Sequence, residues 1–347
     1  MSSPDEKPAN PTLKSIAKAL GMSISGVSIA LRNDPSIPVT TREKVQNEAR
    51  RQGYQRNPLV AAFCANRHPS NYKKLTSLAY LQYGVDKAAK DPHSTNRKFF
   101  EGAQAGALAL GYTVDAFDPV EMGIDYQRLD GILYARGIRG LLLGSPFPPD
   151  ATIRLNWERY TAVSIGQGLA SPEIHNISED NFETIIAVFN GLHKMGYRRP
   201  GLILDDHFDQ RVNHHWSAAF HSFAHQMGEQ SNPSLLYQRV KELDLDAIVD
   251  WARKQKVDVI LGHRADLIPG LQERGLNIPG EIGFATMQGD HLDSGIASVQ
   301  RNALSIGKYA VELLVDELHR NQRGIPEQAK RLRILGSLLT APSLPPR

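Results

Sequence analysis

Apolar residues recur at helical spacing near the start of the chain. Leu13, Ile16 and Leu20 lie three or four positions apart, a pattern that predicts a short amphipathic helix. Gly21 then interrupts the pattern, as a residue that tolerates positive φ does at a tight turn. Ser23 is a good N-cap for a second short helix. Two short helices joined at one glycine, the second opening with small polar residues, are typical of a helix-turn-helix.

A third helix should complete this unit. Its start is predicted at T-T-R-E, where Thr40 and Glu43 have the spacing of a capping box. Three helices in about 55 residues are enough to enclose a small core, whereas any one pair of them could also be an ordinary α-hairpin. The residues predicted to face that core are Val27, Ala30 and Leu31 in the second helix and Val45, Ala49 and Tyr54 in the third.

Beyond position 75 the pattern changes to short apolar runs that alternate with helical stretches. Such alternation predicts parallel sheets covered by helices on both faces, so the fold class is α/β. About 260 residues suit two such lobes better than one. The predicted strands are 75–82, 113–117, 140–144, 161–165, 200–204, 257–262 and 282–287, and the predicted helices include 97–110, 182–195, 215–227, 245–254 and 303–321.

Composition and charge refine this picture. The chain is 41% hydrophobic and 22% charged, as ordinary soluble proteins are, and we find no apolar run of roughly 18 residues that would span a membrane. The N-terminal segment lacks the apolar core of a signal peptide, and a single cysteine, Cys64, suits the reducing cytoplasm. Residues 1–70 hold ten Lys/Arg against five Asp/Glu, while the rest hold thirty against thirty-two. A basic end on a near-neutral body is expected of a module that binds phosphates.

The first part of the chain resembles the headpiece of the lactose/galactose-repressor family. The resemblance rests on T-L-K-S-I-A-K-A-L-G-M-S-I-S-G-V-S, T-R-E-K-V and G-Y-Q-R-N-P-L, which match in register over about 55 residues. It implies a cytoplasmic, homodimeric transcriptional repressor, with a tetramer left open. It also implies a helix-turn-helix headpiece over 1–56, a hinge helix and linker over 57–74, and a two-lobed, periplasmic-binding-protein-like domain over 75–347 for effector binding and dimerisation.

The resemblance also implies which residues contact double-stranded, pseudo-palindromic operator DNA. The family usually has Thr-Val-Ser-Arg where this chain has Gly26-Val27-Ser28-Ile29. Losing that arginine removes the commonest donor to guanine, so base contacts should rely more on apolar side chains. Thr12, Ser23 and Asn57 would hold phosphates, Ile24, Ser25, Gly26 and Ile29 would face bases beside Ser28, and Arg32 would recover a phosphate contact.

The predicted hinge helix begins at Asn57-Pro58, since proline suits the first turn of a helix. In the family, an apolar side chain of this helix wedges into the minor groove, and Phe63 falls at that position. Packing of Phe63 on the partner's hinge is the alternative.

Effector contacts are expected on loops that follow strands, because ligands of open α/β sheets bind at the carboxyl ends of their strands. G-I-R-G-L-L-L, H-K-M-G-Y-R-R-P-G-L and G-L-N-I-P-G-E-I-G match the family's pattern here. Where relatives often carry a sugar-binding arginine, this chain has Trp216, which is either an aromatic platform for a ligand or a core residue. The candidate effector contacts are Gln82, Tyr83, Phe99, Asp180, Arg211, Trp216, His263, Arg264, Gln288 and Asp290.

Catalysis is not expected. The sequence has no G-x-S-x-G, no G-x-x-x-x-G-K-[ST] and no H-E-x-x-H, and no Cys/His cluster at metal-ligand spacing. We therefore predict neither an enzyme nor a bound metal or cofactor, but a regulator whose effector is a small polar molecule such as a sugar or sugar derivative. The alternatives are a solute-binding protein or cryptic sugar enzyme with a vestigial headpiece, and a regulator that needs no ligand.

Overall fold

The computed structural model describes residues 11–31, 34, 36–54, 76–82, 94–145, 151–228, 233–237, 244–287 and 295–347. The chain separates into two compact units, which are described one at a time. The first unit holds the N-terminal helices together with Val315–Arg323, and the second holds Thr76–Leu314 and Gly324–Arg347. The predicted hinge helix lies outside the described residues.

Three short helices form the N-terminal part of the first unit: α1 (Leu13–Leu20), α2 (Ile24–Leu31) and α3 (Val39–Arg51). α1 ends at Gly21 with φ of 63°, as its place in the sequence predicts. The Oγ of Ser23 accepts a hydrogen bond from the Gly26 N–H at 3.0 Å, so the predicted cap of α2 is confirmed. Apolar side chains from all three helices are buried together; they are Ile16, Ala17, Val27, Ala30, Val45 and Ala49.

The predicted capping box at Thr40 and Glu43 is wrong. α3 begins at Val39, so Thr40 lies inside the helix, and Pro38 stands at the N-cap without a side-chain hydrogen bond. The carbonyl of Pro38 accepts the N–H groups of Thr41 and Arg42 instead. A capping box is present at α1, where Thr12 and Ser15 exchange side-chain-to-backbone hydrogen bonds.

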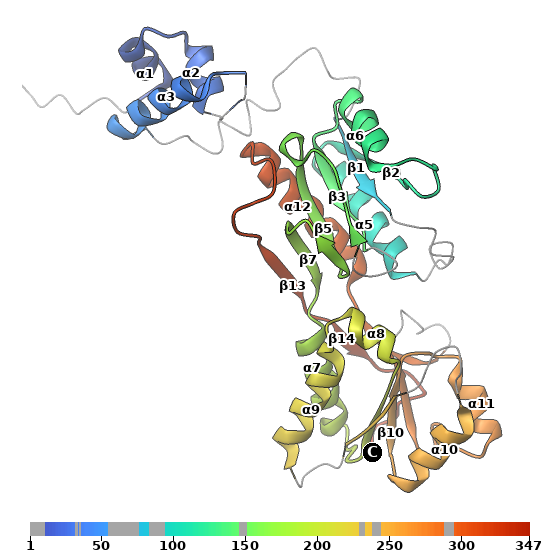
Figure 1. The fold of residues 1–347 in the computed structure, drawn as a ribbon. Helices are drawn as coiled ribbons and strands as arrows, with labels where there is room; N and C mark the ends of the chain where they lie inside the picture. The colour runs from blue at the N-terminus through green and yellow to red at the C-terminus, as the bar shows by residue number, and fades with distance from the viewer. Residues whose placement is uncertain are drawn as a thin grey trace, which may run out of the picture. The chain divides into compact units, whose positions relative to one another are not determined.

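The second unit contains two six-stranded sheets (Figure 1), so the predicted two-lobed α/β fold is confirmed. The first sheet has the order β13-β7-β5-β3-β1-β2 and the second β14-β12-β11-β10-β8-β9, with all pairs parallel except β12 with β14. The strands of the first sheet are β1 (Thr76–Leu81), β2 (Tyr112–Phe117), β3 (Gly140–Leu143), β5 (Thr161–Ile165), β7 (His175–Glu179) and β13 (Arg331–Ile334). Those of the second are β8 (Pro200–Leu204), β9 (Ser234–Tyr237), β10 (Val259–Gly262), β11 (Gly283–Thr286), β12 (Ala297–Gln300) and β14 (Ser337–Leu339), while β4 (Ala151–Thr152) and β6 (Leu169–Ser171) pair separately.

Helices cover both faces of each sheet, as the alternation of strands and helices predicts (Figure 1). In the first lobe, α6 (Tyr126–Ala135) packs on one face, and α5 (Thr95–Ala109) and α12 (Ala303–His319) lie together on the other. In the second lobe, α7 (Asn181–Lys194) and α9 (His215–Met227) share one apolar cluster, and α10 (Leu245–Lys254) and α11 (Leu267–Glu273) belong to another. The chain passes to the second lobe after β7 and β13 and returns after β12.

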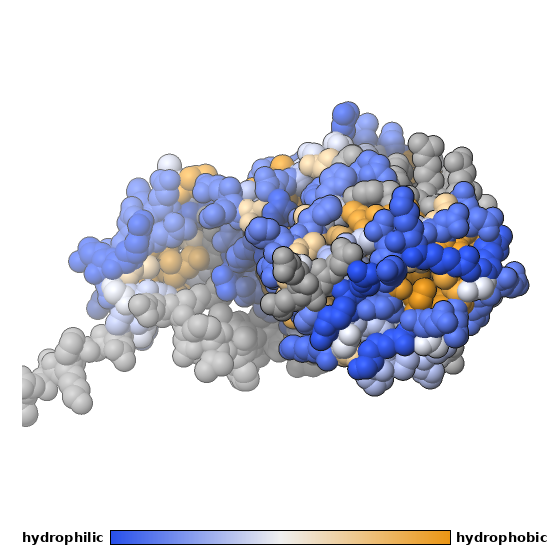
Figure 2. All heavy atoms as spheres, turned by 90° about the horizontal axis from the view of Figure 1, so that it is seen from below, coloured by the Kyte–Doolittle hydropathy of each residue, from blue (hydrophilic) through white to orange (hydrophobic). Residues whose placement is uncertain are grey.

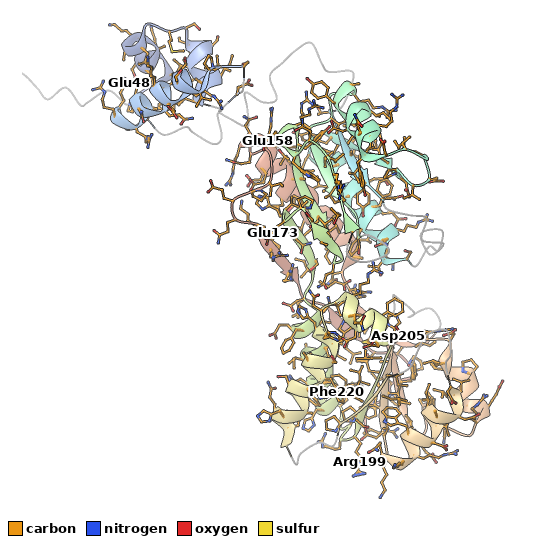
Figure 3. The ribbon with its side chains drawn as sticks, viewed as in Figure 1. Glu48, Glu158, Glu173, Arg199, Asp205 and Phe220 are labelled. Carbon is orange, nitrogen blue, oxygen red and sulfur yellow. The ribbon has the colours of Figure 1, made fainter. Side chains whose placement is uncertain are left out.

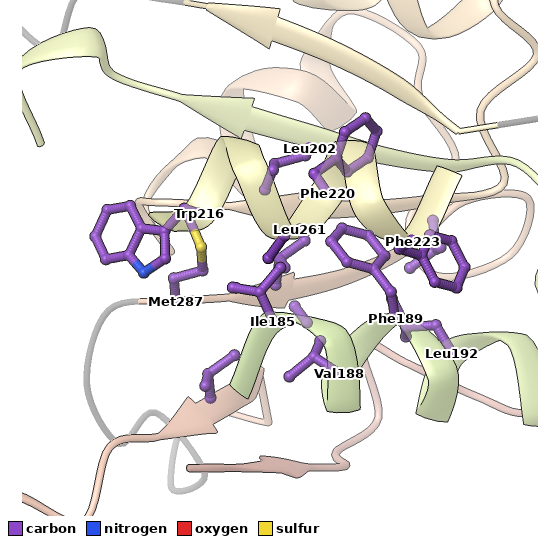
Figure 4. Close-up of a cluster of buried hydrophobic side chains, with 14 of the residues drawn as sticks. Ile185, Val188, Phe189, Leu192, Leu202, Trp216, Phe220, Phe223, Leu261 and Met287 are labelled. Atoms are coloured by element: carbon purple, nitrogen blue, oxygen red, sulfur yellow. The ribbon is translucent and has the colours of Figure 1, made fainter. Parts of the chain in front are cut away.

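Most apolar side chains are enclosed by these layers. Figure 2 shows one face of the molecule, on which hydrophilic residues predominate and hydrophobic ones gather in small patches. In the apolar cluster beneath α7 and α9, the Phe189 ring lies 5.3 Å from that of Phe220 and 5.2 Å from that of Phe223 (Figure 4). Trp216 and Met287 lie at one end of this cluster, so the core leads directly to the ends of the strands.

Candidate functional site

The first turn of α2 presents small and apolar side chains to solvent. Ser23, Ile24 and Ser25 are exposed, with Ile24 49% exposed, whereas Val27 is fully buried. The exposed Ile24 is therefore available for contact with a partner surface. The resemblance predicts base-facing residues here; Gly26, Ser28 and Ile29 are half-buried beside the exposed turn.

Two predicted phosphate contacts open helices of this unit. Thr12 is exposed at the N-cap of α1 and Ser23 at the start of α2. Both side chains already accept a backbone N–H of their own helix, so each hydroxyl has its hydrogen left to donate. Helix N-termini favour anions because their backbone dipoles leave positive partial charge there. Arg32, Asn57 and Phe63 lie outside the described residues.

A pocket lies where parallel strands of the second lobe end, and we call it the Trp216 pocket. It is lined by Glu179, Asn181, Thr184, Trp216, Met287 and Arg301, among others, and encloses about 300 Å³ counted with the solvent at its mouth. Met287 follows β11, Arg301 follows β12, and Glu179 is the last residue of β7. This is the edge at which ligands of parallel α/β sheets bind.

A buried ion pair lies in the wall of the Trp216 pocket. The guanidinium of Arg301 donates through Nε and Nη2 to Oε2 of Glu179, the Nε bond measuring 2.8 Å. Burial raises the pKa of Glu179, and the charges of Arg301 and Arg211 oppose that shift. The other oxygen, Oε1, is buried without a hydrogen-bond partner among the described residues. An acceptor in that state favours a ligand that brings a hydroxyl or amine hydrogen.

Aromatic rings adjoin this ion pair. The His263 ring is 4.2 Å from that of Phe208 and 5.7 Å from that of Trp216, measured between ring centroids. Trp216 is only 5% exposed, and its Nε1 donates to Oδ1 of Asn181 at 3.1 Å, so it belongs to the core and to the pocket at once. Burial lowers the pKa of His263 to about 4, and its Nδ1 has no partner in the described part of the chain. The ring is therefore a neutral hydrogen-bonding group at neutral pH.

The other predicted effector contacts are more dispersed. Arg211 donates from Nη2 to Oγ of Ser145 at 3.0 Å. Asp180 caps α7 by accepting the Glu183 N–H, and Arg264 forms an ion pair with Asp266. Gln82 follows β1 and is half-buried, whereas Phe99 is 3% exposed within α5. Tyr83, Gln288 and Asp290 lie outside the described residues.

Sequence reasoning missed the charged part of the Trp216 pocket. Glu179 is the last residue of β7 and Arg301 follows β12, and neither segment is among the predicted strands. Asp205 was missed too, although it directly follows β8, which was predicted (Figure 3). It is buried and caps the short helix α8 (Asp206–Arg211) through the Phe208 N–H.

Comparisons with known proteins bear on the identity of the chain. The HTH-type transcriptional repressor CytR of Escherichia coli (strain K12) is 26% identical over 193 residues, which are 55% of this chain and 53% of that protein. The chain's match thus spans about half the length of this curated relative. The Lac repressor dimer bound to operator and the anti-inducer ONPF shares the fold, with a TM-score of 0.53 at 14% identity over 96% of this chain and 98% of that one. The chain thus resembles a curated repressor in sequence over half its length and a Lac repressor in fold.

Other solved structures share the fold. The transcriptional regulator CelR in complex with cellobiose has a TM-score of 0.54 at 17% identity, covering 96% of this chain and 99% of that one. The LacI transcriptional regulator from Lactobacillus brevis has a TM-score of 0.55 at 15% identity, covering 76% and 100%. No protein-family model matches the chain. At these identities the structures support the fold alone.

Two further observations concern metals and membranes. Within the described ranges, His, Cys, Asp and Glu side chains do not gather in groups of three that could hold a metal ion. None of the helices described is both long and apolar enough to cross a membrane.

Proposed function

We propose that this repressor relative is a sequence-specific DNA-binding transcriptional repressor, whose affinity for operator DNA is set by a small polar ligand in the Trp216 pocket. The observation that carries the proposal is the exposed first turn of α2, held by the Ser23 cap on a closed three-helix core. In a helix-turn-helix that turn reads base edges in the major groove. The relative CytR is itself described as an HTH-type transcriptional repressor.

Recognition of the operator relies on few charged side chains in α2. Ile24 is exposed and Ile29 is half-buried on that helix, so thymine methyl groups are their natural partners. Thr12 and Ser23 hold phosphates at the ends of α1 and α2, and the remaining affinity comes from basic residues of the headpiece. The chain acts as a cytoplasmic homodimer on a pseudo-palindromic site, with the headpiece over 1–56 and the hinge over 57–74.

The ligand is a sugar or sugar derivative. Trp216 offers an apolar ring face, and Oε1 of Glu179 is a buried oxygen of the pocket wall that lacks a protein partner within the described chain. The ring of His263, whose Nδ1 is also buried without such a partner, packs beside Trp216. Sugar hydroxyls satisfy such atoms, and the apolar face of a pyranose ring packs on an aromatic ring. The transcriptional regulator CelR, which shares the fold, is known as a complex with cellobiose, a sugar of this class.

Ligand binding controls operator affinity because the Trp216 pocket and the headpiece are coupled. A ligand that binds better to one arrangement of the lobes shifts the population toward it and changes how the two headpieces of a dimer are presented to DNA. An inducer favours the DNA-incompetent state and a corepressor the other. No catalytic step is required, and we propose none.

The test recovers the operator from genomic DNA. Sheared DNA from the source organism is incubated with the full chain, and bound fragments are sequenced and footprinted. We expect a short pseudo-palindromic site and Kd values that rise steeply with salt. Residues 69–347 alone should lose operator binding while still binding the sugar that releases the full chain from DNA. Binding without sequence preference, or loss of sugar binding in the truncated chain, would overturn the proposal.

A further inference from the structure

A second pocket follows the β13 edge of the first sheet, and its lining shares no residue with that of the Trp216 pocket. We call it the Arg333 pocket. It encloses about 850 Å³ counted with open solvent, and Gln167, Glu173, Asn176, His215, Arg331 and Arg333 are among its lining residues. Glu173 lies on the side of the lobe that carries β7 and β13 (Figure 3). The proposed function assigns this pocket no role.

The pocket exists because one face of the first sheet is apolar at β3 and β5 but polar at its edge, at β7 and β13. Parallel register pairs Leu141 with Ala162, Ser164 with Asn176, and Asn176 with Arg331. Side chains alternate along a strand, so Arg333 shares this face with Arg331. Leu141 and Ala162 are buried in the apolar cluster of α6. At β7 and β13 the same face carries amide and guanidinium groups, which cannot be covered by an apolar helix without loss of hydration.

Arg333 is held in place by a buried amide. Asn176 is 7% exposed; its Nδ2 donates to Gly166 O at 2.8 Å and to Ser164 Oγ at 3.0 Å. Its Oδ1 accepts from Nη1 of Arg333 at 2.8 Å. Nη1 also donates to the carbonyl oxygen of Leu332 at 3.1 Å. These bonds fix one edge of the guanidinium of the exposed Arg333, and its Nε and Nη2 make no hydrogen bond within the described chain. A fixed guanidinium loses little entropy when it binds an oxyanion.

The charges and a buried amide oxygen both point to a missing partner. Partial burial and the charge of Arg331 lower the pKa of Arg333, with Asp180 opposing the shift, so an anion between the two arginines would relieve their repulsion. Arg331 contacts Glu173 at 2.8 Å, an exposed pair of the kind that contributes little and exchanges readily. Oε1 of Gln167 is buried in the same pocket and has no hydrogen-bond partner among the described residues. A ligand hydroxyl would satisfy it.

We propose that the Arg333 pocket binds a small anion that also carries hydroxyl groups, either a hydroxycarboxylate or a phosphorylated polyol. Arg331 and Arg333 bind the anionic group through charge-assisted hydrogen bonds, and the Gln167 amide pairs with a hydroxyl. His215, the first residue of α9, completes the lining. The site is separate from the sugar pocket and does not depend on the proposed function.

Calorimetric titration of the full chain tests this site with four probes: gluconate, glycerol 3-phosphate, inorganic phosphate and glycerol. We expect gluconate or glycerol 3-phosphate to bind at least tenfold more tightly than inorganic phosphate, and glycerol not to bind. The ratio of gluconate to glycerol 3-phosphate affinity then distinguishes a carboxylate from a phosphate ligand. Failure of both to bind, or binding of glycerol as tight as theirs, would overturn the proposal.

Substitutions of single residues test whether the anion binds in the Arg333 pocket. Arg333→Gln should weaken the better anion about tenfold or more, as expected for loss of one charged hydrogen bond. The matched control is Arg323→Gln, an exposed arginine outside both pockets, which should leave binding unchanged. Trp216→Phe should also leave anion binding unchanged. A loss of anion binding in this variant would assign the anion to the Trp216 pocket and refute a second site.

If circular dichroism shows that Arg333→Gln unfolds the chain, Arg331→Gln serves in its place. Operator binding is measured separately, so its failure does not affect this test.

Discussion

At the residue scale, His263, whose ring lies beside that of Trp216, shows how the local environment determines a charge state. Its ring packs against Phe208 and Trp216, and burial, with help from Arg301 and Arg264 and against Asp205, lowers its pKa to about 4. In the unfolded chain the imidazole titrates near its ordinary pKa of about 6.5. The folded state therefore binds fewer protons between these two values, and stability falls as pH drops from about 6.5 towards 4.

We predict that His263→Gln flattens this dependence. Between pH 7 and pH 4.5 the wild-type chain should lose about 2 kcal/mol more of its free energy of unfolding than the variant does, because only the wild type has an imidazole to protonate. Urea unfolding at half-unit pH intervals measures the difference. His225→Gln, an exposed position on α9, should keep the wild-type slope. Equal slopes for wild type and His263→Gln would contradict the buried neutral imidazole.

Some of the Trp216 pocket could be predicted from residues and some could not. Trp216 and His263 were both predicted, and they lie 5.7 Å apart. Glu179 and Arg301 were not predicted, because their contact joins residues 122 positions apart, and a polar segment such as H-N-I-S-E does not resemble a strand in isolation. Long-range ion pairs leave no local periodicity for a sequence pattern to record.

At the element scale, α5 and α12 pack with almost no space between their backbones. A Cβ at Gly307 would lie 2.0 Å from the carbonyl oxygen of Phe99, and one at Gly102 would lie 2.0 Å from that of Leu304. Such contact distances are accessible only to glycine, so these two positions determine how closely the helices approach. Gly131, in α6, has nothing within 4 Å of its Cβ position.

These two environments predict opposite effects of the same substitution. Gly307→Ala should lower the free energy of unfolding by about 2–3 kcal/mol, since overpacking forces the helices apart. Gly131→Ala should raise it by about 0.5–1 kcal/mol, because alanine loses less backbone entropy in a helix. Chemical denaturation of both variants beside the wild type measures the pair. A Gly307→Ala chain as stable as the wild type would mean that the two helices are not in backbone contact.

Elements differ in how well the sequence predicts them. Strands buried on both faces, such as β3 and β8, appear as continuous apolar runs and were predicted within a residue or two. β13, with the sequence R-L-R-I, was missed because an exposed edge strand alternates polar and apolar residues over too short a length. The start of α3 was misplaced. Thr40 has the residue type and spacing of an N-cap, but the helix already begins at Val39, with Pro38 at the N-cap.

At the scale of the whole molecule, the proposed function requires that ligand and operator influence each other. The Trp216 pocket lies at the ends of β7, β11 and β12, and the chain passes between the lobes directly after β7 and β12. A ligand that fills the pocket therefore contacts two of the segments whose backbone must turn when the lobes change their angle. This geometry supplies a physical route for coupling, which is a free energy and must be reciprocal.

We predict that reciprocity can be measured directly. For the sugar that alters operator binding, saturation should change the operator Kd by a factor of about 5 to 150, and saturating operator should change the sugar Kd by the same factor. Fluorescence anisotropy on labelled operator gives the first value and calorimetry gives the second. Residues 69–347, which lack the headpiece, should bind the sugar with the Kd of the DNA-free full chain and be indifferent to operator. A sugar that raises the operator Kd without a plateau as its concentration increases competes with DNA for the headpiece, because allosteric coupling reaches a limiting factor at saturation; that result would exclude the two-state mechanism.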